Sequence, residues 1–228
     1  MKQAKKILGT LLVAVCLNPG IGWAEPDPNS ILDQIRSAQV QISQPLSAIL
    51  RPEKGDSIPI KLQFSGQKIQ YELNNPPEKL TVQLTDTGSV LNQQTAAGQQ
   101  TLSGSKLVEP VRGTDVTYED LSLRFLYWRN ARYEGERNVR SVTCSVILVQ
   151  PPNRNSEYSS VRIWIAKDRG AMVKAEGFDA SGKLIKRFEV ISIQTIEDKT
   201  IFKQIRIERV DSSTGKIASR TYLELGEA

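Results

Sequence analysis

Apolar and polar residues alternate almost continuously through the second half of the chain, and this pattern constrains the fold more than any other feature. Six segments carry it: residues 142–149, 159–166, 171–178, 184–193, 201–210 and 217–225. A period of two is typical of strands that bury one face. The segments are separated by short runs of Gly, Pro, Asn, Asp and Ser, and short turns force neighbouring strands to be antiparallel.

The same period appears earlier in the chain. Residues 58–64 and 69–73 flank a Ser65-Gly66-Gln67 turn and predict a hairpin, and residues 80–84 predict a further strand. We therefore expect about 9 to 11 antiparallel strands, a number at which a sheet curls and needs helices to cover its inner face. Residues 93–105 are rich in Gln, Thr, Gly, Ser and Ala without any period, and they predict a long flexible loop.

A helical period replaces the alternation in residues 28–50. Ile31, Ile35 and Ile42 recur at helical spacing behind a capping-box-like pair, Ser30 and Asp33. We expect an amphipathic helix that packs on the sheet with one apolar face. Residues 25–55 would then form an N-terminal helical segment before a half-barrel domain of residues 56–228, and residues 25–228 would fold as a single domain.

A second, short helix is expected within residues 113–127, between the two groups of strands. Thr117 and Asp120 have the spacing of an N-terminal cap, and Leu121, Phe125 and Leu126 place apolar groups on one face. We interpret this segment as a structural crossover. Its acidic side chains are expected to hold helix ends instead of touching a ligand.

Residues 1–24 have the layout of a secretory signal peptide. Three lysines precede an apolar run over residues 7–17, and small residues end at Ala24, after which we expect cleavage. The run is shorter than the about 20 residues of a membrane-spanning helix, so we expect a soluble periplasmic protein with no integral membrane span. Lipid attachment at Cys16 is disfavoured because Val15 fills the position that requires a small residue.

Several classes of chemistry find no support in the sequence. The chain has no histidine, which removes the commonest general base and metal ligand. Cys144 lies within an alternating strand, a pattern that indicates a buried, inert thiol. Residues 177–183 spell most of a phosphate-binding loop, but Leu184 replaces the required Ser or Thr and a strand pattern follows. We therefore expect no catalytic residue, no metal site and no cofactor.

The charge of the chain does not indicate a polyanionic partner. Without the lysines of the signal peptide the sequence carries 27 positive and 25 negative side chains, a net charge of +2. They are scattered along the predicted strands, which is typical of a solvated sheet face. We therefore expect no nucleic acid as a partner.

Five stretches resemble one family of exported bacterial proteins. They are residues 113–121, 161–168, 173–178, 182–188 and 221–225. In order and spacing they resemble the outer-membrane lipoprotein-sorting proteins of the LolA superfamily, over residues 56–226. The resemblance implies an α+β, mainly β fold: a curved antiparallel incomplete β-barrel, lidded by the N-terminal amphipathic helix and the short central helix. No arginine aligns with the one that contributes to lid closure in the well-studied carriers.

The resemblance also implies a hydrophobic concavity that holds an acyl chain or another apolar ligand. Its candidate lining consists of apolar residues on the alternating strands together with one residue of the central helix: Leu62, Phe64, Tyr71, Leu73, Val82, Leu84, Phe125, Val146, Leu148, Ile163, Ile165, Phe188, Ile205 and Leu223. A plain core role is the competing interpretation for each of them, because core packing and ligand contact require the same alternation.

Two functions remain open from the sequence. The first is a periplasmic carrier or chaperone that shields the acyl chain of a lipoprotein cargo, with protein partners at the inner and outer membranes. The alternative is an envelope protein-interaction or regulatory module, in which the same fold is packed solid and its rim or edge strands bind a partner. Neither function is enzymatic.

Overall fold

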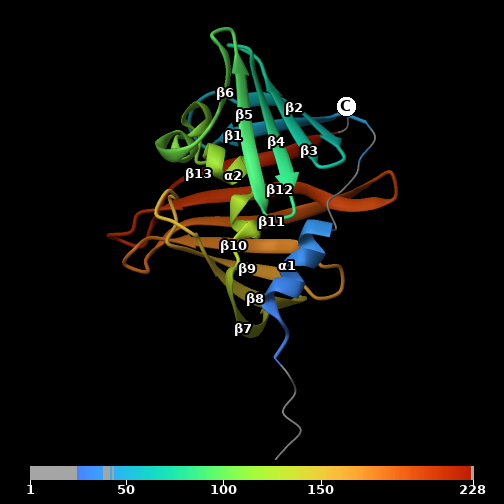
Figure 1. Ribbon diagram of the computed structural model, residues 1–228, viewed down its shortest axis with the longest axis vertical. Helices are drawn as coiled ribbons and strands as arrows, with labels where there is room; N and C mark the ends of the chain where they lie inside the picture. The colour runs from blue at the N-terminus through green and yellow to red at the C-terminus, as the bar shows by residue number, and fades with distance from the viewer. Residues whose placement is uncertain (1–24, 38–41, 43, 227–228) are drawn as a thin grey trace, which may run out of the picture.

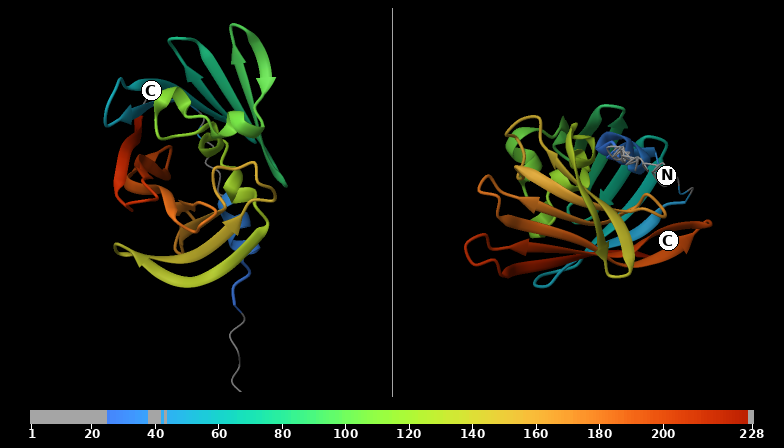
Figure 2. Two further views of the ribbon diagram at one scale, coloured as in Figure 1. Left: turned by 90° about the vertical axis from the view of Figure 1, so that its left-hand side faces the viewer. Right: turned by 90° about the horizontal axis from the view of Figure 1, so that it is seen from below.

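The protein is dominated by one large antiparallel sheet. The computed structural model describes residues 25–37, 42 and 44–226. Within these residues the sheet has 13 strands, shown in Figures 1 and 2. The strands are β1 (Leu46–Pro52), β2 (Ile58–Ser65), β3 (Lys68–Leu73), β4 (Glu78–Thr85), β5 (Gly88–Thr95), β6 (Gly98–Thr101), β7 (Asn130–Val139), β8 (Val142–Gln150), β9 (Ser160–Ala166), β10 (Met172–Phe178), β11 (Leu184–Ile196), β12 (Lys199–Val210) and β13 (Ile217–Gly226).

The strand order is a meander with one long-range joint. It runs β6-β5-β4-β3-β2-β1-β13-β12-β11-β10-β9-β8-β7, so all neighbours follow each other in sequence except β1 and β13. β1 pairs with β2 on one side and with β13 on the other. The sheet is curved and open, with β6 and β7 as its free edges, and it does not close into a barrel. The predicted antiparallel meander is confirmed, with more strands than expected.

Short helical elements lie on the concave side of the sheet (Figures 1 and 2). The N-terminal helix α1 spans Pro28–Ser37, and four more elements follow β6: the 3-10 helices η1 (Gly104–Val108), η2 (Val111–Gly113) and η3 (Arg124–Tyr127), and the single-turn helix α2 (Tyr118–Leu121). We call residues 104–128 the central segment. Its apolar side chains belong to the main core: Leu107, Val111, Val116, Leu121, Phe125, Leu126, Tyr127 and Trp128.

The alternation of each strand decides which side chains enter this core. In β1, Leu46, Ala48 and Leu50 are buried in it, whereas Ser47 and Ile49 face outward and are exposed. Such a pattern is expected of a sheet with one covered face. At about 25 cal/mol per Å² of apolar surface buried, this concave core is the main source of stability.

The outer face of the second half is held together by charge. Five side chains of alternating sign stand directly opposite one another across β9 to β13, in the order Arg162, Glu176, Arg187, Glu208 and Arg220. Arg187 lies 3.1 Å from Glu176 and 3.2 Å from Glu208, which also contacts Arg220 at 3.0 Å. Opposite charges on facing strands stabilise a sheet, so this charge ladder supports a face that no other layer covers.

Two predictions for the first half of the chain are wrong. The N-terminal helix ends at Ser37 instead of Leu50, and the second part of the predicted helix is strand β1. Residues 38–41 and 43 of that prediction lie outside the described residues, as do the signal peptide and Cys16. The predicted flexible loop of residues 93–105 instead forms the end of β5, all of β6 and the start of η1.

The prediction that Val146 and Leu148 of β8 point to the concave face is also wrong. Ile147 and Val149 enter the main core, whereas Val146 packs with Cys144 and Trp164 in a second cluster on the outer face. Leu148 stands opposite Arg162, in the same outward row as the charge ladder. β8 is apolar on both faces, so its alternation does not identify the inner one.

Candidate functional site

The concave face brings together most of the predicted ligand-lining residues. Leu62, Leu73, Val82, Leu84, Phe125, Ile163 and Ile165 are buried in the main core, and Phe64, Tyr71, Phe188, Ile205 and Leu223 are half-buried against it. Val146 and Leu148 are not part of this face. The residues that join the concave face without having been singled out include Leu46, Leu50, Leu80 and Leu91.

The cover over the concave face is incomplete along β11 to β13. Phe188, Ile205 and Leu223 point into the core side of the sheet but keep part of their apolar surface exposed. Ile205 and Leu223 stand directly opposite each other, and Leu223 stands opposite the fully buried Leu50. Phe188 stands opposite Ile207, the next residue of β12 on this face, so the three half-buried side chains form a partly exposed apolar patch, which we call the concave patch.

The central segment is tied to the first half of the sheet by polar contacts. The Tyr71 hydroxyl donates to the carbonyl of Leu121 at 3.1 Å, and the Ser89 hydroxyl donates to the carbonyl of Ser122 at 2.7 Å. Arg112 donates to the carbonyl of Pro76 at 2.6 Å. The first two bonds satisfy main-chain carbonyls at the end of α2, and the third satisfies a carbonyl in the turn between β3 and β4.

Tyr118 joins the same attachment through Glu78. Its hydroxyl lies 3.0 Å from one carboxylate oxygen of Glu78. The other oxygen of Glu78 lies 3.5 Å from the guanidinium of Arg112. Burial and the nearby Glu78 carboxylate raise the pKa of Tyr118 to about 12. The phenol therefore remains a hydrogen-bond donor at any physiological pH.

The start of α2 has the capping box that its sequence predicts. The Thr117 side chain accepts from the amide of Asp120, and the Asp120 carboxylate accepts from the amide of Thr117 at 2.8 Å. The same carboxylate also binds Lys186 of β11 at 2.8 Å and receives the Tyr158 hydroxyl at 2.6 Å. Asp120 therefore fixes the helix and attaches it to the second half of the sheet.

Lys186 is the centre of a buried charge cluster, which we define as Lys186, Asp120, Glu157, Arg209 and Asp115. Lys186 has 0% of its surface exposed and also pairs with Glu157 at 2.7 Å. Glu157 in turn pairs with Arg209 at 3.0 Å, and Arg209 lies 3.8 Å from Asp115. A buried lysine is tolerated only with such partners, because an isolated buried charge is strongly unfavourable.

Asp115 anchors the central segment to β13. Its carboxylate accepts hydrogen bonds from the hydroxyls of Thr221, at 2.9 Å, and Ser219. The Thr221 hydroxyl also accepts from the Asp115 amide at 3.1 Å. Asp115 and Asp120 do hold the segment in place, as predicted, but they bind distant strands as well as local helix ends.

Glu119 has incomplete hydrogen bonding. It is 1% exposed, and one carboxylate oxygen accepts from the amide of Glu157 at 3.0 Å. The other oxygen has no hydrogen-bond partner among the described residues. Burial, with a smaller contribution from the charge of Asp120, raises the pKa of Glu119 above its ordinary value.

Gly177 provides the space for this cluster. A Cβ at this position would lie 2.3 Å from the Tyr158 ring, so only glycine lets the ring pack flat on β10. The ring in turn lies 5.5 Å from the Lys186 ammonium and holds Asp120 by its hydroxyl. The glycine of the apparent phosphate-loop motif therefore has a packing role.

The sequence did contain one signal for Lys186. It occupies the same parity along β11 as Phe188, so it is a charge on an apolar face. A charge in that position requires buried partners. Its partners come from α2 and the β8–β9 connection, which sequence spacing cannot relate to β11.

Helix α1 contacts β7 and η3. Leu32 is fully buried in the core, and Arg36 donates to the carbonyl of Leu126 at 2.8 and 2.5 Å. The Arg36 guanidinium also lies over the Tyr127 ring at 5.1 Å. Ile31 and Ile35 are half-buried against the same core, so the helix is attached by its apolar face together with Arg36.

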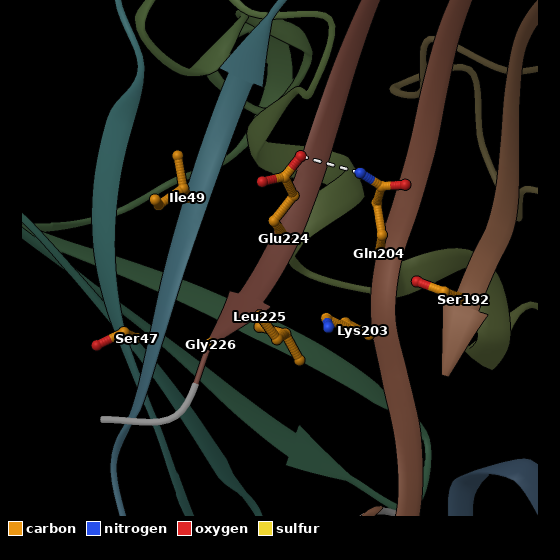
Figure 3. Close-up of a pocket in the computed structure, with 8 residues that line it drawn as sticks. All are labelled: Ser47, Ile49, Ser192, Lys203, Gln204, Glu224, Leu225 and Gly226. Atoms are coloured by element: carbon orange, nitrogen blue, oxygen red, sulfur yellow. Dashed lines mark hydrogen bonds between the residues drawn. The ribbon is translucent and has the colours of Figure 1, made fainter. Parts of the chain in front are cut away.

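Two open hollows lie on the surface. One, of about 320 Å³, is bounded by residues of α1, η3, the end of β4 and the β2–β3 and β4–β5 turns, including Arg36, Leu84 and Tyr127. It lies beside the junction of α1 with the sheet. The other, of about 300 Å³, lies on the outer face of β1, β13, β12 and β11. Figure 3 shows Ile49, Glu224 and Gln204 side by side in it, with Gln204 donating to Glu224 at 2.9 Å.

The described residues contain no group of three or more His, Cys, Asp or Glu side chains placed to hold a metal ion. None of the helices in the described part of the chain is long and apolar enough to span a membrane. Cys144 is buried in the outer cluster, and burial raises its thiol pKa.

Comparisons with solved structures identify the fold. The chain is similar to a DUF1329 family protein from Desulfovibrio piger, with a TM-score of 0.70 and 18% identity over 88% of this chain and 92% of that one. A putative outer membrane lipoprotein-sorting protein domain from Vibrio parahaemolyticus has a TM-score of 0.69 and 15% identity over 88% and 92%. A LolA superfamily protein from Nitrosomonas europaea has a TM-score of 0.64 and 15% identity over 89% and 93%.

Sequence comparisons add the family. No curated protein matches the chain. A family model with the description "Uncharacterized protein" matches residues 97–226, which is more than half of the chain. The chain therefore belongs to that family, and its fold is the one seen in LolA superfamily and lipoprotein-sorting proteins.

Proposed function

We propose that the protein is a periplasmic carrier or chaperone that binds an acyl chain, or a ligand of similar apolar chemistry, on the concave face of its sheet. The observation that carries the proposal is the concave patch of half-buried apolar side chains, Phe188, Ile205 and Leu223, on neighbouring strands β11 to β13. The likeness to a lipoprotein-sorting domain and to a LolA superfamily protein supports the same class of ligand.

Binding would rest on burial of apolar surface and needs no reaction step. A ligand lying along β11 to β13 would cover the exposed parts of these side chains, at about 25 cal/mol per Å². Helix α1 is the element that would move, since it lies outside the sheet and is attached through one apolar face, Ile31, Leu32 and Ile35, and through Arg36. The central segment would stay in place, because two of its residues in the buried charge cluster, Asp120 and Asp115, attach it to β11, β12 and β13.

Uptake of a fluorescent fatty acid tests the proposal. We expect the wild-type protein to bind it, and Ile205→Ser to weaken binding by about fivefold, because roughly 1 kcal/mol of apolar contact is lost. Ile49→Ser is the matched control, since Ile49 is 39% exposed on the outer face of β1. It should bind like wild type.

Two results would contradict the carrier proposal. Circular dichroism must first show that both variants are folded. If Ile205→Ser and Ile49→Ser take up equal amounts of fatty acid, the concave patch is not part of the binding site. Wild-type protein that takes up no fatty acid, and that carries no lipid in native mass spectra after purification from its own host, would exclude the carrier function.

A second candidate function is an envelope protein-interaction module. It is favoured by the way the central segment itself fills much of the concave face with its apolar side chains. This function predicts the absence of lipid together with the capture of a protein partner. Both candidates place the protein in the periplasm, on the basis of the signal-peptide layout of residues 1–24.

A further inference from the structure

The two free edges of the sheet are protected to different degrees. β7 carries charged side chains, among them Arg132, Glu134 and Arg137, and a bulge between Tyr133 and Glu136 interrupts its pairing. Helix α1 also contacts this strand. Charges, bulges and covering helices are the devices by which proteins prevent an edge strand from pairing with another chain.

Within the described residues, β6 has no charged side chain and no bulge, and its short length is what limits pairing at this edge. Its four residues, Gly98–Thr101, are all exposed, and within the described sheet it is hydrogen-bonded to β5 alone. Residues 87–105 include no charged side chain, in a chain with 30 basic and 25 acidic residues. The pairing of β5 with β6 is regular, without a bulge. An edge of this kind is ready to accept another strand.

We propose that β6 pairs in antiparallel fashion with β6 of a second copy of this chain. A two-fold axis perpendicular to the sheet would join the two sheets into one and keep both concave faces on the same side. Without the signal peptide each copy carries a net charge of +2, so an uncharged stretch is where two copies approach with the least repulsion.

The side chains of the edge are complementary to themselves. An amide side chain both donates and accepts hydrogen bonds, so Gln99 can pair with Gln99 of the second copy when the two-fold axis passes between these two residues. Such pairing already occurs within the chain, where Gln100 donates to Gln93 at 2.7 Å and Thr101 to Asn92 at 2.7 Å. A charged partner strand would find no complementary charge here.

The size of the edge defines the strength of the dimer. Stable interfaces bury at least about 1,200 Å² in total, and a strand of four residues offers less than that. We therefore infer a weak dimer, populated at high protein concentration. Both acyl-binding faces would remain open, so the dimer does not depend on the proposed function.

Sedimentation velocity over a concentration series tests this inference. We expect wild-type protein to pass from monomer to dimer, and Gln99→Lys to weaken association by about fivefold, because two symmetry-related lysines then face each other across the new strand pair. Mixing Gln99→Lys with Gln99→Glu should restore association as a heterodimer. Gln99 is exposed, so these changes leave the fold intact.

The control variant is Arg137→Glu, which alters the charge of the opposite edge at an exposed position. It should associate like wild type. A wild-type protein that is monomeric at every concentration would overturn the inference, as would a dimer that Gln99→Lys leaves unchanged. Capture of a foreign protein that is lost in Gln99→Lys, with no self-association, would assign the edge to another partner and also overturn it.

Discussion

Individual residues of the buried charge cluster carry the contact between the central segment and the second half of the sheet. Lys186, Asp120 and Tyr158 come from β11, α2 and the β8–β9 connection, and each bonds to another. Their arrangement depends on the missing side chain of Gly177, because the Tyr158 ring occupies the space of its Cβ. A small residue on β10 therefore determines whether a distant helix can dock.

We predict that Gly177→Ala destabilises the protein by about 2 kcal/mol, since overpacking of a dense site typically costs this much. The added methyl group would push the Tyr158 ring away from Lys186 and Asp120. Chemical denaturation monitored by circular dichroism measures the change. The double variant Gly177→Ala/Tyr158→Ala supplies the control, because the clash is then absent. If Gly177→Ala lowers stability equally in the Tyr158→Ala background, the ring is not the cause.

Among the helical elements, α2 depends most on its surroundings. A helix of four residues cannot form by itself, because nucleation is unfavourable and few main-chain bonds are gained. The capping box and the bond from Asp120 to Lys186 hold it in place. Glu119 instead destabilises this arrangement when it is charged. Its carboxylate is buried next to Asp120, and one oxygen lacks a partner among the described residues.

We predict that Glu119→Gln makes stability less dependent on pH. The pKa of Glu119 is raised in the folded protein, so the folded state holds its proton at a pH where the unfolded chain has lost it. This contribution is fully present below the ordinary value of 4.5 and is lost as pH rises through the folded pKa. Wild type should therefore lose stability relative to Glu119→Gln over that window.

Urea denaturation of the two proteins at a series of pH values measures the difference. Above the window, Glu119→Gln should be the more stable protein, because glutamine can keep the bond from the Glu157 amide without a buried charge. Parallel stability curves for the two proteins would show that Glu119 does not titrate in this range. Asp56→Asn, at an exposed carboxylate between β1 and β2, provides the comparison.

Across the protein as a whole, stability should fall from the centre of the second half toward the β6 edge. β9 is buried on both faces, by the main core and by the outer cluster, whereas β5 buries only Leu91 and β6 is exposed throughout. Local opening is easiest where few apolar contacts are lost. The open architecture therefore has one firm region and one loosely held edge.

Hydrogen exchange at low protein concentration should reveal this gradient. We expect the amides of β6 to exchange fastest among the strands and those of β9 slowest. If β6 pairs with a second copy, its protection should rise with protein concentration while that of β9 stays constant. Equal protection of β6 and β9 in dilute solution would contradict the gradient.

The sequence by itself determined the antiparallel meander, the capping box of α2 and the inner face of strands such as β2 and β12, because these follow from local periods and short turns. It could not distinguish helix from strand at residues 46–50, where the outcome depends on pairing with β13, far away in sequence. It could not choose the inner face of β8, since both faces are apolar.

Only the tertiary structure decided where the charges lie. The sequence places Lys186 on the apolar face of β11 but does not show its partners, which lie on α2 and the β8–β9 connection. The same holds for the charge ladder, whose members come together only when β9 to β13 pair in the observed register. Local pattern determines which segments become strands, while long-range pairing determines which side chains meet, because a one-residue change of register reverses every face.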